Sequence, residues 1–144
     1  MRVLAVKANQ HLARISGRYE VFLTHEMKRL QELNFDIVDM YQGDHIRPMN
    51  TLSGGETFLV SLALALGLSD MASGSNPVES LFVDEGFGAL DPQTLEMALS
   101  ALENLQSTGK TIGIISHVEL LKERIPCQIQ LIKKGAGVSE IVVK

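Results

Sequence analysis

The stretch TLSGGE at 51–56 contains the residue types of a helix start that contacts phosphate. Gly54 and Gly55 have no side chains, so a ligand can approach backbone N–H groups where the dipole of a following helix favours an anion. Glu56 stands three residues after Ser53, the spacing of a capping box, and a well-made helix start is the plain alternative. A helix that needed only a cap would not carry two glycines in its first turn, since each costs about 1 kcal/mol relative to alanine. The stretch therefore predicts a phosphate contact.

A pair of carboxylates ends the next apolar stretch. In SLFVDEGFGALD the strand-like residues run directly into Asp84 and Glu85. Ligands of an open parallel sheet collect at the carboxyl ends of its strands, which is where this pair is expected. Asp84 is suited to hold Mg²⁺, directly or through water, and Glu85 to orient an attacking water as general base. The alternative is a strand that leaves the core and ends in solvent. Neither task can be done by two acidic residues alone without a bound triphosphate.

His117 ends a further apolar strand, after Ile114, Ile115 and Ser116. A lone histidine in such a place is more often a structural residue. Here a neighbouring strand end already carries two carboxylates, which favours a functional role. A histidine hydrogen-bonded to a γ-phosphate can report whether that phosphate is present.

The chain contains no P-loop of the form G-x-x-x-x-G-K-[ST], whose backbone nest and lysine hold phosphates. The run NLQSTGKT at 104–111 comes nearest, but Asn104 replaces its first glycine. It also lies between a helical pattern and a strand, whereas a P-loop follows a strand and opens a helix. The run therefore predicts a helix C-cap at Gly109.

Helices that alternate with apolar strands are expected to position these groups. A stripe of apolar residues predicts a first helix that ends at Ser16 and Gly17. A second helix is expected over about 54–71, and Asp91 followed by Pro92 marks the start of a third. The stripes of the first and third helices are Leu4, Ala8, Leu12, Ile15, Leu95, Ala98, Leu99, Leu102 and Leu105.

The remaining pattern predicts an α/β fold with a largely parallel sheet flanked by helices, and a terminal β-hairpin. Residues 42–50 have the composition of a turn. Strands are expected at 19–25, 35–41, 80–84 and 111–116, short helices at 26–33 and 118–125, and hairpin strands at 127–134 and 138–144.

Composition narrows the function classes. The 144 residues are 45% hydrophobic and 21% charged, with a net charge of -4, which argues against a dominant nucleic-acid face on this chain. The apolar run at 58–68 is too short for a bilayer span, and the first residues lack a secretory core. The single Cys127 excludes an internal disulfide and is predicted to be a small buried hydrophobe. A cytoplasmic chain without a membrane partner is expected.

In combination, these motifs resemble the signature, Walker B, D-loop and switch-histidine elements of ABC-type ATPases. They are TLSGGE, the strand ending in Asp84 and Glu85, the pair Leu90 and Asp91, and the strand-ending His117. The stretches DEGFGALD, TLSGGETFLVSLALALGLSD and ISHVELLKERIP are similar to the carboxyl-terminal end of SbcC, the ATPase subunit of the SbcCD nuclease. The resemblance runs from about residue 8 to the end of the chain.

The resemblance implies a head assembled from both ends of a long chain, with an antiparallel coiled coil between them. Residues 1–144 would form its carboxyl-terminal lobe, with 1–17 as the root of the returning coil. The partners implied are the amino-terminal half with the Walker A P-loop, a second ATPase head, an SbcD-like nuclease, and DNA through the assembled complex. The isolated chain is then expected to be inactive.

The resemblance also assigns the site residues to two heads. Asp84, Glu85 and His117 would serve the ATP and Mg²⁺ of their own head, with Asp84 on the metal. Asp91 would cross the dimer interface, and Ala89 departs from the Ser or Thr more usual before Leu-Asp. The residues facing ATP of the other head would be Ser53, Gly54, Gly55 and Glu56.

Two other classes stay open at this stage. A chromosome-organising head of the SMC or RecN kind can share LSGGE, so the GFGALD stretch carries the distinction. A fragment of a transporter motor is disfavoured because transporter proteins of this type usually have Gln after the two signature glycines, where this chain has Glu56.

Overall fold

The computed structural model describes residues 2–23, 35–72, 79–107 and 109–144. Its helices are α1 Arg2–Ile15, α2 Gly54–Ala72, α3 Pro92–Ser107 and α4 Glu119–Arg124, with 3₁₀ turns η1 Met40–Gln42, η2 Met49–Thr51 and η3 Phe87–Ala89. Its strands are β1 Tyr19–Leu23, β2 Phe35–Asp39, β3 His45–Pro48, β4 Ser80–Asp84, β5 Thr111–Ile115, β6 Ile129–Gly135 and β7 Val138–Val143.

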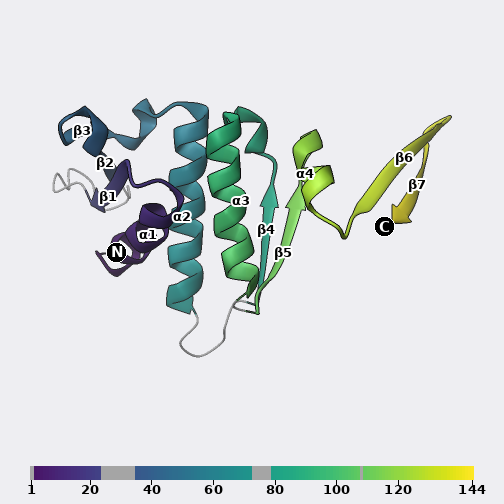
Figure 1. Cartoon of the computed structure of the whole chain (residues 1–144), viewed down its shortest axis with the longest axis horizontal. Helices are drawn as coiled ribbons and strands as arrows, with labels where there is room; N and C mark the ends of the chain where they lie inside the picture. Colours follow the sequence, from purple (N-terminus) through teal and green to yellow (C-terminus); the bar gives the residue numbers. More distant parts are fainter. Residues whose placement is uncertain (1, 24–34, 73–78, 108) are drawn as a thin grey trace.

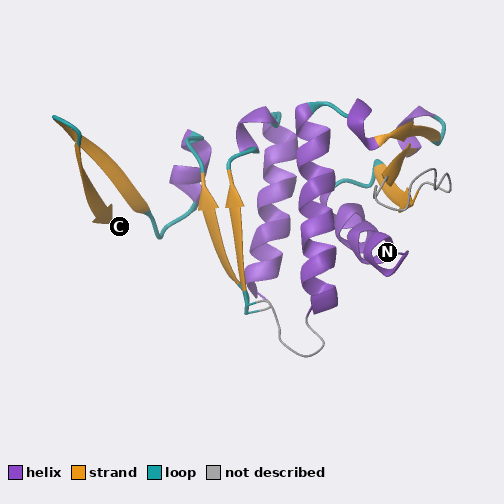
Figure 2. Ribbon diagram, turned by 180° about the vertical axis from the view of Figure 1, so that it is seen from behind, coloured by secondary structure: helices purple, strands orange, loops and turns teal. Residues whose placement is uncertain are grey.

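The elements form a row with α2 and α3 side by side at its centre (Figures 1 and 2). On one side lie α1 and an antiparallel sheet of order β1-β2-β3; on the other lie the parallel strands β4 and β5, then α4 and the hairpin β6–β7. The helices α2 and α3 run opposite in direction to β4 and β5. The arrangement brings the amino ends of the two central helices to the same edge as the carboxyl ends of β4 and β5.

The core is centred on the contact of α1 with α2. Leu12 and Ile15 from the predicted stripe are fully buried, and burial of such a side chain stabilises the fold by roughly 1.5–3 kcal/mol. Gly67 of α2 allows the closest approach, since a Cβ there would lie 2.7 Å from the backbone nitrogen of Ala8. At the end of the same helix pair, Nε2 of the buried His11 lies 2.7 Å from a carboxylate oxygen of Asp70.

The side chain of Asn9 connects α1 to the first sheet by hydrogen bonds. The amide of Asn9 donates to the carbonyl of Val21 at 2.9 Å and accepts from its N–H at 2.8 Å. Asn9 thus satisfies both backbone groups of one β1 residue, as a neighbouring strand would. These hydrogen bonds therefore hold the middle of β1 against the middle of α1.

Most predicted elements are confirmed, including the α/β class, the helix starts and the terminal hairpin turning at Gly135–Gly137. Parallel pairing within the described residues is confined to β4 and β5, while β1–β3 form an antiparallel sheet. Residues 45–48, expected in a turn, form the edge strand β3. Pro48 is tolerated there because an edge strand has one side without ladder hydrogen bonds. The helix expected at 26–33 lies outside the described residues.

Two expectations about apolar residues are corrected. Cys127 is exposed rather than buried, because it lies in the connection that leads from α4 to the projecting hairpin. The apolar run at 58–68 belongs to a helix of 19 residues, which by length and composition alone could cross a membrane. Its buried residues pack in the core cluster beside α1 and α3, whereas Leu68 and Met71 of the same helix are exposed.

One face of the β4–β5 sheet and the hairpin are left uncovered by the described residues. Leu81 and Val83 point towards the core, whereas Phe82 is 73% exposed on the opposite face, as is Ile115 at 56%. The hairpin side chains Ile129, Leu131, Val138, Ile141 and Val143 are also exposed. Apolar area of this extent normally contacts another surface.

The isolated chain is therefore expected to bind a hydrophobic dye and to self-associate at high concentration. Phe82→Ser should reduce dye fluorescence, since it removes the ring at the centre of the uncovered face without opening a cavity. Val6→Ser, at a similarly exposed position on α1 (58%), is the matched control and should leave the signal unchanged. A monomer without dye binding would show that this face needs no cover.

Candidate functional site

All of the site residues predicted from sequence lie along the edge where α2 and α3 begin and β4 and β5 end (Figure 1). The signature loop, residues 51–56, precedes and opens α2. Glu85 and His117 follow the two parallel strands, and Asp91 precedes α3. The described part of the P-loop-like run lies at the opposite edge, where Lys110 donates to Ser69 on α2. Gly109 has the positive φ, +92°, expected of a helix C-cap, and its N–H donates to the carbonyl of Gln106 at 2.9 Å.

The signature loop is a capping box. The backbone N–H of Ser53 donates to Oε2 of Glu56 at 2.8 Å, and the N–H of Glu56 lies 3.4 Å from the Ser53 hydroxyl. Gly54 is exposed, in keeping with access for a ligand. Gly55 also has a packing role, because a Cβ there would lie 3.0 Å from the carbonyl oxygen of Ala89. The signature loop and the segment leading to Asp91 are thus in direct contact.

Asp91 caps α3 as predicted. One carboxylate oxygen accepts from the N–H groups of Gln93 and Thr94 at 3.0 Å each, and the other accepts from the Thr94 hydroxyl at 2.5 Å. These hydrogen bonds, that of the Thr94 hydroxyl first, lower the pKa of Asp91. The carboxylate is exposed and charged at neutral pH.

Glu85 and His117 are brought together by the parallel register. Asp84 pairs with Ile115, and the N–H of Glu85 donates to the carbonyl of Ile115 at 2.9 Å. Consequently Nδ1 of His117 lies 3.0 Å from Oε2 of Glu85. Both side chains are solvent-accessible, at 80% for the histidine and 51% for the glutamate. The pair is therefore pre-oriented and open to a ligand.

Glu85 adopts a backbone conformation that is unfavourable for a side chain. Its φ is +58°, in the left-handed region that non-glycine residues rarely occupy. Such strain commonly occurs at functional sites, where the surrounding structure enforces it. Here the hydrogen bond from its N–H to Ile115 fixes the residue at the strand end.

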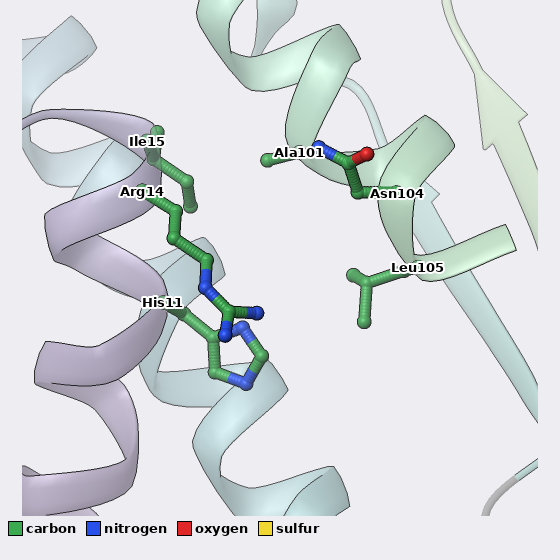
Figure 3. A pocket seen from close by; sticks show the side chains of 6 residues that line it. All are labelled: His11, Arg14, Ile15, Ala101, Asn104 and Leu105. Atoms are coloured by element: carbon green, nitrogen blue, oxygen red, sulfur yellow. The ribbon is translucent and has the colours of Figure 1, made fainter. Parts of the chain in front are cut away.

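The site residues fall into two groups. Ser53, Gly55, Glu56 and Asp91 line one open depression with a volume of about 570 Å³. Its other walls are the turn after α1 and the first turns of α3, with Ser16, Gly17, Arg18, Tyr19, Tyr41, Leu59, Ala89, Gln93, Thr94 and Met97. Asp84, Glu85 and His117 do not line it. A second cavity of about 60 Å³ lies between His11 of α1 and Leu105 of α3 and has room for only a few water molecules (Figure 3).

A cluster of charged and polar side chains extends from the wall of the depression into the interior, and the sequence indicated only one of its members, Glu56. The members, here called the Tyr19 cluster, are Arg18, Tyr19, Asp39, Arg47 and Glu56. Arg18 donates from Nε and Nη2 to the two carboxylate oxygens of Asp39, at 2.9 and 2.6 Å. Asp39 is fully buried, and the Arg18 hydrogen bonds hold its pKa below the ordinary value. The Tyr19 hydroxyl donates to Oε1 of Glu56 at 2.5 Å, and Arg47 donates to the same oxygen at 3.1 Å.

Glu56 is therefore held as a carboxylate. Burial alone would raise its pKa, but hydrogen bonds from Tyr19, the Ser53 N–H and Arg47 outweigh this effect and lower the pKa to about 2. Burial, and then the hydrogen bond to Glu56, raise the pKa of Tyr19. Both carboxylate oxygens of Glu56 accept hydrogen bonds from donors of this chain. In this geometry Glu56 supports the signature loop from the interior of the protein.

Asp84 is a suitable ligand for a metal ion at this edge. Among the described residues, no group of three or more His, Cys, Asp and Glu side chains could hold an ion. Asp84 is exposed at the end of β4 and offers hard carboxylate oxygens. Mg²⁺ is usually held by one or two carboxylates, waters and substrate phosphates, so a single carboxylate fits it.

The sequence profile described as "SbcC/RAD50-like, Walker B motif" matches residues 27–104. The chain belongs to this family. It is 45% identical over 141 residues to the SbcC subunit of the SbcCD nuclease of Pseudomonas aeruginosa, covering 98% of this chain and 11% of the relative. Against the SbcC protein of Deinococcus radiodurans it is 46% identical over 127 residues, covering 88% and 13%. The chain thus spans about a tenth of the length of these relatives.

Solved structures of SMC ATPases share the fold. One, from a study of ATP-driven dimerization and DNA-stimulated activation, has a TM-score of 0.76 at 18% identity and covers 99% of this chain and 83% of that chain. The SMC head domain from Thermotoga maritima has a TM-score of 0.64 at 23% identity, covering 100% and 48%. The fold expected from the sequence, a lobe of an ABC-type ATPase head, is confirmed.

The strain at Glu85 makes a prediction about stability. Glu85→Gly should be more stable than Glu85→Ala by about 1 kcal/mol in urea denaturation, because only glycine relieves the left-handed conformation. The same pair of substitutions at Glu20, in the regular strand β1, is the control and should give the opposite order. A less stable glycine variant at position 85 would contradict the argument.

The Tyr19 cluster predicts loss of stability in acid. The folded pKa of Glu56 is about 2 against an ordinary 4.5, so its contribution is complete above pH 4.5 and is lost as the pH falls towards 2. Glu56→Gln should flatten the pH dependence of the free energy of unfolding in that window. Glu123→Gln, at an exposed glutamate, is the matched control and should retain the wild-type slope.

Proposed function

We propose that this chain is the carboxyl-terminal lobe of a cytoplasmic ATP-binding and ATP-hydrolysing head that acts in DNA double-strand end processing with a nuclease partner. Residues 1–144 are one half of the head, and α1 continues the root of a returning coiled coil. The observation that carries the proposal is the Glu85–His117 pair at adjacent parallel strand ends, 3.0 Å apart and exposed, in a chain whose sequence lacks a P-loop. Such a pair can act on phosphates only when another lobe binds them and brings them to this site.

Each residue of the pair has a distinct role in the proposal. Glu85 accepts a proton from the attacking water and orients it, while His117 contacts the γ-phosphate and keeps the glutamate in place through Nδ1. Asp84 holds Mg²⁺, which when bound neutralises negative charge on the phosphate oxygens. The left-handed backbone of Glu85 supports these roles, because such conformations often occur at functional sites.

The separation of the site into two groups supports a dimer of heads. Ser53 and Asp91 line the open depression, whereas Glu85 and His117 lie outside it. In the proposed dimer, the signature loop closes over the ATP bound to the opposite head, and Asp91 lies at the interface. The exposed end of α2 offers the backbone N–H groups of Gly54 and Gly55 to the γ-phosphate.

The partners proposed are the amino-terminal half of the same protein, a second head, an SbcD-like nuclease and DNA. The uncovered face around Phe82 is the surface that the amino-terminal half would cover. With a net charge of -4, this chain is proposed to meet DNA through the assembled complex rather than by a basic face of its own. The 45% identity to a nuclease subunit favours end processing over chromosome organisation, since the SMC heads are similar in fold at only 18–23% identity.

In the assembled head, Glu85→Gln is expected to retain ATP binding but lower turnover at least about 100-fold, and to accumulate an ATP-bound dimer, because only the water-orienting group is lost. Ser53→Arg should leave nucleotide binding to each head intact and prevent dimerisation, because a bulky cation blocks closure of the signature loop. Turnover and light scattering with ATP distinguish the two outcomes.

A mixed dimer tests which head supplies Ser53. With Ser53→Arg in one head and Glu85→Gln in the other, trans action concentrates both lesions in one site and leaves the second site intact. Trapping of nucleotide should then differ between the two sites, and equal trapping would rule out the trans assignment. As a control, calorimetry of the isolated chain with Mg-ATP should show no tight binding; a micromolar dissociation constant would contradict the half-site proposal.

A further inference from the structure

The two oxygens of Glu56 face different structures. Oε2 accepts the backbone N–H of Ser53 and fixes the start of the signature loop. Oε1 turns inward, where it accepts from the Tyr19 hydroxyl and from Arg47. One carboxylate thus joins the loop on the surface to the sheet β1–β3 beneath it.

The Tyr19 cluster extends this link to α1. The guanidinium of Arg18 lies 4.9 Å from the centre of the Tyr19 ring, and that of Arg47 lies 6.0 Å from it. Both arginines contact Asp39, at 2.6 and 3.4 Å. The cluster members share hydrogen bonds, so a displacement of one changes the contacts of its neighbours. Arg18 follows the last residue of α1 by only three positions.

Arg47 links the edge strand β3 to the carboxylate of the signature loop. Its Nε is buried and has no hydrogen-bond partner among the described residues. Its Nη2 donates to Oδ2 of Asp39 at 3.4 Å and to Oε1 of Glu56 at 3.1 Å.

We propose that Tyr19 and Arg47 are positioning residues for the signature loop: acting through Glu56, they set where Ser53 lies relative to the ligand in the depression. This inference rests on the proposed function. Through these contacts, α1 and the sheet β1–β3 control closure of the loop over nucleotide. Tyr19 also lines the depression, but the role proposed for both residues is to orient Glu56. Loss of the contacts with Glu56 leaves each head able to bind nucleotide but weakens the dimer that Ser53 closes.

The test uses the assembled head carrying Glu85→Gln, in which hydrolysis does not dissolve the dimer. Tyr19→Phe removes one hydroxyl and should weaken ATP-dependent dimerisation about 10-fold, with nucleotide affinity of the single head unchanged. Arg47→Lys, which keeps the charge but loses the planar fork, should act in the same direction. Asp70→Asn is the matched control, since it also removes a contact between α1 and α2, at the other end of α2. It should not change dimerisation.

A double-mutant cycle separates positioning from general stability. If Tyr19 acts through Glu56, Tyr19→Phe should have little further effect on dimerisation in a Glu56→Gln background. Additive effects, or an equal effect of Asp70→Asn, would overturn the assignment. Failure of the Glu85→Gln parent to dimerise with ATP would instead overturn the proposed function itself, together with this inference.

Discussion

The burial of α2 is the constraint on which the rest of the structure depends. Leu59, Val60, Leu62, Ala63 and Leu66 are all buried, with α1 and the antiparallel sheet on one side and α3 on the other. Sliding or rotating α2 would remove these side chains from the core. Its first turn, which carries the signature loop, is therefore presented at a fixed place on the edge of the molecule.

The groups of the candidate site lie at the surface, and the groups that support them are buried. Ser53, Glu85, Asp91 and His117 are exposed, whereas Asp39, Tyr19 and Phe87 below them are buried. Exposed groups can meet a ligand that arrives from another lobe, and the buried layer keeps them from moving independently. The contact of Gly55 with the Ala89 carbonyl connects the two helix starts in the same way.

Local signals allowed much of the site to be predicted from the sequence. The cap at Asp91, the capping box at Ser53 and the strand ends at Glu85 and His117 each depend on residues close together in the chain, and the structure contains all of them. The family was also identified correctly from these motifs. Their assignments to nucleotide, metal and the opposite head stay predictions.

The features that were missed depend on contacts between distant residues. Arg18 and Asp39 are 21 positions apart and resemble ordinary surface charges until β1 and β2 pair. Strand β3 has little apolar alternation, and its pairing with β2 defines it. The packing role of Gly55 requires Ala89, which lies beyond the whole of α2 and β4. Periodicity reports which face of an element is buried, but not which element covers it.

The exposed Cys127 gives this chain a practical property. It is the single cysteine in the sequence, and it stands at the connection between α4 and the projecting hairpin. A maleimide fluorophore would therefore attach at one defined position without any engineering. Because the apolar hairpin residues are open to solvent nearby, the emission of such a label would report, in real time, when another surface covers the hairpin.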